Sequence, residues 1–149
     1  MIQQPSKKRS TKDGTKKKPK GVSYYKKQAD AYFSTYVRMR DADAKGIAPC
    51  ITCNIRKHWK QLQNGHFVSR KTSLLRYDEE NCNAQCYSCN VMRYGEQYLY
   101  AKALDDKYGD GTADKLMNQR HTTHKFTIDE LQQIVEDSKT QIDYLTNSA

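Results

Sequence analysis

The sequence lacks any long hydrophobic run. No segment approaches the roughly 20 apolar residues that a membrane-spanning helix needs. The opening Met1-Ile2-Gln3-Gln4 leads into lysines instead of the apolar core of a signal peptide. We therefore expect no membrane association and a location in the reducing cytoplasm, where disulfides are rare.

Hydrophobic residues are also scarce overall. They make up 36% of the chain, and the mean hydropathy is -1.01. A chain of 149 residues fits one domain, but this composition leaves it only a modest core. We expect a single domain over residues 23–149 that gains support from a bound metal.

Acidic residues are nearly absent from the first 20 positions, which carry eight basic side chains against Asp13 alone. A run this basic, with no apolar periodicity, cannot bury enough surface to offset the entropy of ordering. We expect residues 1–22 to be a disordered tail that either improves solubility or binds phosphates by releasing counterions. Nucleic acid is the favoured polyanion for a net charge of +9. The candidate phosphate-binding side chains of the tail are Lys7, Lys8, Arg9, Lys16, Lys17 and Lys18.

Four of the five cysteines form two pairs, Cys50-x-x-Cys53 and Cys86-x-x-Cys89. Two such pairs can complete the tetrahedral shell of a structural zinc ion. The 32 residues between the pairs leave room for a hairpin and a loop. A thioredoxin-like redox pair would need a βαβ pattern around it, which makes that alternative weaker. Cys82 has no partner at ligand spacing, so we interpret it as a small, partly buried side chain.

Helices are expected at both ends of the folded region. Ser23 is a candidate N-cap for a first helix that stops at Gly46. Its basic side chains either contact a nucleic-acid backbone or form an ordinary solvated face; they are Lys26, Lys27, Arg38 and Arg40. Thr127 and Glu130 form a capping-box pattern that predicts a last helix over about residues 127–146. Its apolar stripe packs on the domain's own core or forms a dimer seam; it comprises Leu131, Ile134, Val135, Ile142 and Leu145.

Between these helices we expect a short hairpin in residues 47–66 and a polar functional loop over residues 69–85. A helix should follow from Asn90 to about Lys107, and a shorter one over residues 113–120. The longer helix would partly bury Met92, Leu99 and Leu104. The predicted fold class is α+β, mostly helical.

Several motifs together carry a resemblance to a known family. Gly65-His66-Phe67, then Asp78 to Asn81, then Cys86-x-x-Cys89-Asn90 resemble an HNH nuclease of the ββα-metal type. More narrowly, the chain resembles the lambdoid phage recombination nucleases called NinG or Rap over roughly residues 23–107. The stretches that carry this narrower resemblance are Tyr25-Lys26-Lys27-Gln28-Ala29-Asp30, Phe33-Ser34-x-Tyr36-Val37-Arg38-x-Arg40-Asp41, Ile51-Thr52-Cys53, Gln63-Asn64-Gly65-His66-Phe67-Val68-Ser69-Arg70 and Gln85-Cys86-x-x-Cys89-Asn90.

The resemblance implies a ββα-metal core at about residues 47–107, in which hairpin and helix embrace a catalytic cation beside the four-cysteine zinc site. It also implies a metal-dependent, structure-selective DNA endonuclease that acts on branched recombination intermediates such as Holliday junctions and D-loops. The expected catalytic ion is Mg²⁺, with Mn²⁺ as a possible substitute. The setting would be the cytoplasm of the bacterial host, and a homodimer would suit an enzyme that cuts two strands of a junction.

Three residues are the candidate catalytic machinery. His66 is the candidate general base, because a neutral imidazole accepts a proton near pH 7. Asn81 resembles the middle Asn of the HNH pattern and would orient the loop that carries the base. Asn90 resembles the final motif position, where its carbonyl oxygen would bind the catalytic cation.

The chain departs from the HNH pattern at Gly65, where many of these nucleases have an Asp that ligates the metal. Asp78, Glu79 or Glu80 could supply the missing ligand, with Asp78 and Glu80 preferred. Alternatively, Mg²⁺ could keep several waters and rely on the substrate phosphate. Ligation of the metal by His66 itself stays an open assignment.

Arg70 and Arg76 flank this proposed centre. Guanidinium groups match phosphate oxygens, so the two residues either grip the scissile phosphate or are ordinary surface arginines. The tyrosines nearby could stack on unpaired bases or serve only in packing; they are Tyr77, Tyr87, Tyr94 and Tyr98. The alternative function is a zinc-containing DNA-binding module without catalysis, which would not need His66, Asn81 and Asn90 together.

Overall fold

The computed structural model describes residues 18–148. The expected phosphate-binding residues Lys7, Lys8, Arg9, Lys16 and Lys17 lie outside this range, whereas Lys18 is exposed in an extended segment before the first helix. The helical elements are α1 (Val22–Arg40), α2 (Gln97–Tyr108), α3 (Thr112–Asn118) and α4 (Ile128–Asn147). The strands are β1 (Ile47–Pro49), β2 (Arg56–His58), β3 (Gln63–His66) and β4 (Cys82–Gln85). Within this range, no helix is both long and apolar enough to span a bilayer.

Helix α1 begins one residue before Ser23, so the expected cap was wrong. Gly21 is the N-cap, and no side chain bonds the free amides there. The helix ends at Arg40, well before Gly46. The chain turns earlier because the Asp43 carboxylate accepts hydrogen bonds from the backbone of Lys45 and Ile47.

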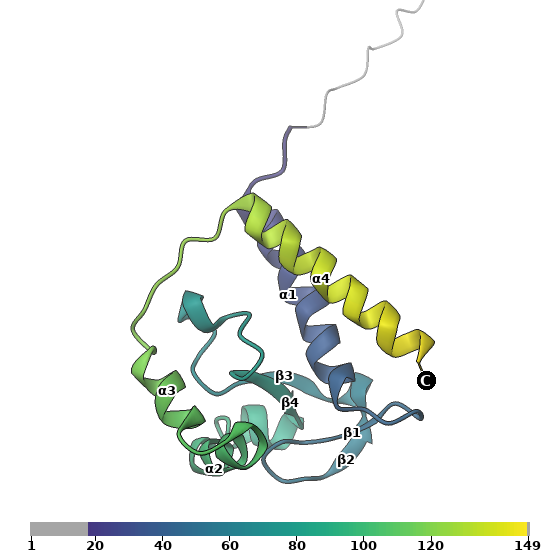
Figure 1. Cartoon of the computed structure of the whole chain (residues 1–149), viewed down its shortest axis with the longest axis vertical. Helices are drawn as coiled ribbons and strands as arrows, with labels where there is room; N and C mark the ends of the chain where they lie inside the picture. Colours follow the sequence, from purple (N-terminus) through teal and green to yellow (C-terminus); the bar gives the residue numbers. More distant parts are fainter. Residues whose placement is uncertain (1–17, 149) are drawn as a thin grey trace, which may run out of the picture.

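Helix α4 packs along α1, and the two form one side of the molecule (Figure 1). The expected capping box is present, because Thr127 and Glu130 exchange side-chain and backbone bonds. The apolar stripe of α4 faces α1: Leu131 and Val135 are buried with Ala29. The remaining stripe residues pack around Phe33, Tyr36 and Val37; they are Ile134, Ile142 and Leu145. Of the two alternatives for this stripe, packing on the domain's own core is confirmed.

The strands form two separate antiparallel pairs. β1 pairs with β2, whereas β3 pairs with β4 so that His66 lies opposite Cys82. The expectation that the strand ending at His66 pairs within residues 47–66 was wrong, because its partner lies in the segment expected to be a loop. All four residues of β4 are buried, including the polar Asn83 and Gln85, so burial does not follow the polarity of the side chains.

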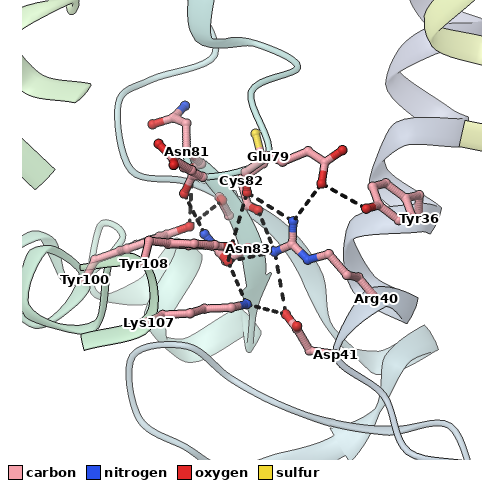
Figure 2. A network of polar contacts seen from close by, with 12 residues as sticks. Tyr36, Arg40, Asp41, Glu79, Asn81, Cys82, Asn83, Tyr100, Lys107 and Tyr108 are labelled. Carbon is pink, nitrogen blue, oxygen red and sulfur yellow. Dashed lines mark hydrogen bonds and ion pairs between the residues drawn. The ribbon is translucent and has the colours of Figure 1, made fainter. Parts of the chain in front are cut away.

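A polar network attaches β4 to the ends of two helices (Figure 2). The buried Asn83 accepts hydrogen bonds from Arg40 at 2.8 Å, Tyr108 at 2.8 Å and Lys107 at 3.2 Å. Arg40 also donates to the backbone of Cys82 and Glu79. Charged donors and a buried acceptor satisfy one another here, as a buried polar group requires. Arg40, one of the four basic residues of the first helix, is therefore a structural residue.

The expected continuous helix after Cys89 is interrupted. Ser88–Met92 forms a π-helical turn, the chain then reverses at Gly95, and α2 starts only at Gln97. The Gly95 amide donates to the carbonyl of Cys89, which stops the first turn from continuing. Leu104 is buried as expected, but Met92 is 66% exposed and Leu99 is 42% exposed.

Candidate functional site

The four paired cysteines converge on one point. All four Sγ atoms lie within 4.8 Å of one another, and those of Cys53 and Cys86 are 3.8 Å apart. A tetrahedral zinc ion with Zn–S bonds of about 2.3 Å separates its sulfur ligands by about 3.8 Å. The cluster can therefore hold a metal ion such as zinc. Cys82 stands apart from it, fully buried beside Phe33 and Val37.

Each cysteine pair forms a backbone turn of the same type. The amide of Asn54 donates to the carbonyl of Cys50, and the amide of Asn90 donates to the carbonyl of Cys86, each at 2.9 Å. The first turn closes because Asn54 adopts the left-handed conformation, with φ +57°. The second turn fixes Asn90 directly beside a cysteine of the cluster.

Local hydrogen bonds favour ionisation of one thiol in the cluster. Burial opposes ionisation of Cys50, but donors from Thr52 and from the backbone of Cys86 and Cys53 outweigh it and lower its pKa to about 6. The thiolate is the form that binds a metal. Cys50 can therefore supply the first anionic ligand near neutral pH.

His66 ends β3 with its ring partly buried. Its Nε2 lies 3.0 Å from the carbonyl oxygen of Arg76. A carbonyl only accepts hydrogen bonds, so Nε2 carries the proton and Nδ1 keeps its lone pair. Burial lowers the pKa of His66 below its usual value, which keeps the ring neutral. A neutral ring with a free nitrogen is the form that a general base needs.

Asn81 lies fully buried at the start of β4. Its Oδ1 accepts from the amide of Val68 at 2.7 Å, and its Nδ2 donates to the carbonyls of Val68 and Leu75 at 2.9 and 3.0 Å. These bonds hold both ends of the segment that follows His66. The buried Tyr100 adds a bond to the carbonyl of Gly65 at 2.8 Å.

Asn90 and His66 line the same hollow beside the cysteine cluster. Asn90 donates from Nδ2 to Oε1 of Gln63 at 2.7 Å, which leaves its carbonyl oxygen as the free end of the amide. We call this hollow the polar hollow; its lining includes Asn64, His66, Ser69, Arg70, Asn90 and Tyr94. The structure therefore brings His66 and Asn90 to one hollow, while Asn81 holds the backbone of the segment after His66.

The expected acidic ligands point elsewhere. The Asp78 carboxylate accepts from the backbone of Asn81 at 2.8 Å, and the Glu80 carboxylate pairs with Lys115. Glu79 accepts from the hydroxyl of Tyr36 at 2.9 Å. Neither Asp78 nor Glu80 lines the polar hollow. Among residues 18–148, the cysteine cluster is the only group of three or more His, Cys, Asp or Glu side chains close enough to share an ion.

Gly65 has no room for the Asp found at this position in many HNH nucleases. A Cβ added there would collide with the side-chain oxygen of Gln85, which is fully buried. One residue earlier, Oδ1 of Asn64 is buried without a hydrogen-bond partner. Asn64 and His66 share one face of β3 because strand side chains alternate. An unpartnered amide oxygen beside His66 fits an oxygen ligand of a hard cation.

Comparison with known proteins assigns the chain to a family. The family model described as Bacteriophage Lambda NinG protein matches residues 2–148. The chain belongs to the NinG family. It is 30% identical over 127 residues to proteins called ninG from Escherichia phage 933W, Escherichia phage lambda and Salmonella phage P22. Each alignment covers 85% of this chain and 59% or 60% of the relative, so the chain spans about three fifths of their length. No solved structure matches.

In this NinG-family chain, the two arginines expected to bind phosphate differ in whether their guanidinium groups are already paired. Arg70 is exposed and lines the polar hollow. Arg76 instead forms a two-pronged ion pair with Asp30 of α1, with N–O distances of 2.8 and 2.6 Å. Arg76 thereby attaches the segment after His66 to α1, and its guanidinium is already occupied.

A second hollow, which we call the basic groove, meets the polar hollow at Asn64, His66 and Arg70. Its α1 wall carries Lys27, Asp30, Ser34 and Arg38, which recur every three or four residues on one helix face. Lys27 and Arg38 were expected as basic residues of the first helix, whereas Asp30 and Asn64 were not among the candidate site residues. Helical spacing could have grouped Asp30 with Lys27 and Arg38. Only the packed structure reveals that the buried oxygen of Asn64 has no hydrogen-bond partner.

Proposed function

We propose that this chain is a metal-dependent DNA endonuclease of the HNH, ββα-metal type. The observation that carries the proposal is the meeting of His66, Asn64 and Asn90 at one hollow, next to the cysteine cluster. The order along the chain supports it: β3 ends at His66, β4 begins after Asn81, and the turn that follows carries Asn90. This order agrees with the one expected of a ββα-metal core.

In the proposed reaction, Nδ1 of His66 takes a proton from a water molecule as the oxygen of that water bonds to the scissile phosphorus. The bond from phosphorus to the leaving sugar oxygen breaks, and that oxygen takes up a proton from solvent. The carbonyl of Arg76 holds the imidazole and keeps the accepting nitrogen free. Arg70 is positioned to bind a phosphate oxygen, and Lys27 and Arg38 of the basic groove would hold the adjoining backbone. A positioned base of this kind contributes about 10²–10⁴-fold to a reaction rate.

Asn64 and Asn90 are the residues that would hold the catalytic ion through their amide oxygens, and His66 is assigned as the base. When bound, Mg²⁺, or Mn²⁺ in its place, would stabilise the charge that develops on the phosphate and the leaving oxygen. Two neutral ligands are compatible with Mg²⁺, which retains waters and uses substrate phosphate. The cysteine cluster would hold structural Zn²⁺ and thereby fix Asn90.

The proposed substrate is branched DNA formed during phage recombination, such as Holliday junctions and D-loops. The resemblance to the NinG or Rap nucleases supports this choice, and the net charge of +9 agrees with a polyanionic substrate. Cleavage of both strands of a symmetric junction would require two active sites, so a homodimer on DNA is part of the proposal.

The test is cleavage of labelled four-way junction, D-loop, linear duplex and single strand by the zinc-loaded protein, each with Mg²⁺ or without added Mg²⁺. We expect cutting of the branched substrates that requires both Mg²⁺ and His66, with His66→Ala retaining DNA binding. Tight binding without cutting by the wild-type protein would instead support a non-catalytic DNA-binding module. Full activity of His66→Ala would remove His66 from the mechanism.

A further inference from the structure

The segment after the cysteine cluster carries an unusual concentration of exposed apolar side chains. Tyr94 is 89% exposed, Tyr98 is 72% exposed and Met92 is 66% exposed. We call the two tyrosines, Tyr94 and Tyr98, the aromatic ridge. Val91 and Leu99 of the same segment are also exposed, as is Tyr87 within the second cysteine pair. In a chain with so few apolar residues, several exposed ones within eight positions of one another favour a contact surface.

The backbone under Tyr94 is held in an uncommon conformation. Tyr94 and Glu96 both have left-handed backbones, with φ +54° and +50°, and Gly95 lies between them. Bulky residues rarely adopt this conformation, because their Cβ crowds the carbonyl that follows. A conformation of this kind persists only when the surrounding structure holds it.

What holds the turn is the cysteine cluster. The amide of Gly95 donates to the carbonyl of Cys89 at 2.8 Å, and the carbonyl of Gly95 accepts from the buried Gln85 at 3.0 Å. The Arg93 amide donates to the carbonyl of Ser88 at 2.9 Å. Tyr94 is thus displayed on a braced turn, which lowers the entropy lost when it binds a ligand.

The position of Tyr94 decides what it can contact. Tyr94 lines the polar hollow with His66 and Asn90, so a nucleic acid bound there meets the tyrosine ring beside the reacting phosphate. Lys102 lies 5.1 Å above the ring of Tyr98, which adds positive charge to the ridge. A protein partner seated on the ridge would cover the mouth of the hollow. These observations favour DNA as the occupant.

Resting on the proposed function, we propose that the aromatic ridge stacks on unpaired bases and so selects branched or gapped DNA over continuous duplex. Every base presents a face for stacking, so the contact tolerates any sequence. In a continuous duplex the faces are covered by neighbouring pairs, whereas bases at a branch point or gap are open. Tyr94 is the principal stacking residue and Tyr98 the second. Tyr77 takes no part, because its hydroxyl bonds Asp30 and its ring packs on Phe33.

The experiment uses the zinc-loaded full chain carrying His66→Ala in buffer without added Mg²⁺ or Mn²⁺, so that bound DNA stays intact. The probes are a gapped duplex with 2-aminopurine at an unpaired position and the matching continuous duplex. Stacking of a tyrosine on 2-aminopurine quenches its fluorescence. Tyr94→Ala should abolish this quenching and weaken binding to the gapped duplex by about tenfold or more. Its affinity for the continuous duplex should stay unchanged. Tyr94→Phe should behave as the parent, because stacking does not need the hydroxyl.

Tyr144→Ala is the matched control, since Tyr144 is 67% exposed on α4 and should have no effect. Zinc content and circular dichroism report folding, and Tyr98→Ala carries the test if Tyr94→Ala loses zinc. Equal affinity of parent and Tyr94→Ala for the gapped duplex would overturn the inference. A parent that self-associates in sedimentation and a Tyr94→Ala variant that does not, both with the same DNA affinity, would also overturn it. That result would assign the ridge to contact with a second copy of the chain.

The inference can fail independently of the proposed function. If the protein with an intact His66 cuts branched DNA in Mg²⁺ and Tyr94→Ala cuts it with the same selectivity, only the role of the ridge is lost. If the wild-type protein binds none of the DNA probes, the proposed function fails and the ridge loses its ligand with it.

Discussion

The side-chain amide of Asn81 bonds the backbone of Val68 in both directions, accepting from its amide at 2.7 Å and donating to its carbonyl at 2.9 Å. The two lie 13 positions apart along the chain. The pairing imitates the contact of a neighbouring strand and continues the β3–β4 ladder past His66. It therefore fixes the backbone immediately after the proposed base.

Replacing Asn81 should damage this clamp. We expect Asn81→Ala to lower the free energy of unfolding by about 2–4 kcal/mol, because it leaves the buried amide of Val68 without an acceptor. Proposed cleavage activity should fall as the segment after His66 loosens. Urea unfolding with the exposed Asn118→Ala as control measures the stability loss. Equal midpoints for the two variants would show that the clamp contributes nothing.

The cysteines offer an internally controlled test of the metal cluster. Cys50→Ser should lose bound zinc and unfold the region around β4, because metal binding energy is part of the folding energy of such a site. Cys82→Ala should keep the zinc, since Cys82 is buried away from the cluster. Metal content by mass spectrometry and circular dichroism decide the outcome. A stable, well-folded protein without zinc would contradict the structural role.

Asn64 should control the affinity for the catalytic cation. Asn64→Asp adds a carboxylate where the amide oxygen now lies, so we expect Mn²⁺ to bind about tenfold more tightly to the zinc-loaded protein. Asn64→Ala removes the ligand and should weaken binding by a similar factor. Electron paramagnetic resonance of free Mn²⁺ gives the affinities, with Asn118→Asp controlling for added charge. No change in either Asn64 variant would exclude this residue as a ligand.

The Asp30–Arg76 pair should make stability depend on pH. Burial opposes ionisation of Asp30, but hydrogen bonds from Arg76 and Tyr77 and the charge of Arg76 outweigh it, so its pKa is lower than usual. A lowered carboxyl pKa gives stability that is complete above the unfolded value of about 3.8 and is lost as the pH falls through the lower, folded value.

Asp30→Asn should therefore be less stable than wild type at pH 7, by about 1–3 kcal/mol. The difference should shrink below about pH 4 as the wild-type carboxyl takes up its proton. Urea titrations of both proteins across this range measure it. A difference that stays constant down to pH 2 would mean that the ion pair is not its source.

Much of the site could be predicted from short-range patterns. Two cysteines separated by two residues meet one ion wherever the rest of the chain goes, so the cluster followed from spacing. The capping box of Thr127 and Glu130 is likewise a local feature and marks the start of α4. Motif order supplied the candidates His66, Asn81 and Asn90.

Strand β4 could not be predicted, because its Asn83 and Gln85 are buried by partners far along the chain. Arg40, Lys107 and Tyr108 satisfy Asn83, and Gln85 packs against Gly65. Polar residues of this kind favour the prediction of a loop. Their burial is favourable only once α1 and α2 are in position.

The sequence by itself determined the cysteine cluster, the two long flanking helices and the family, because each depends on residues near one another in the chain or on motif order. The tertiary structure alone decided which side chains are free to act. In it, Arg76 forms an ion pair with Asp30 and Glu80 forms one with Lys115. An oxygen of Asn64 is left without a hydrogen-bond partner beside His66. Long-range packing sets those pairings, since the groups involved meet only when α1, β3, α3 and the segment before β4 come together.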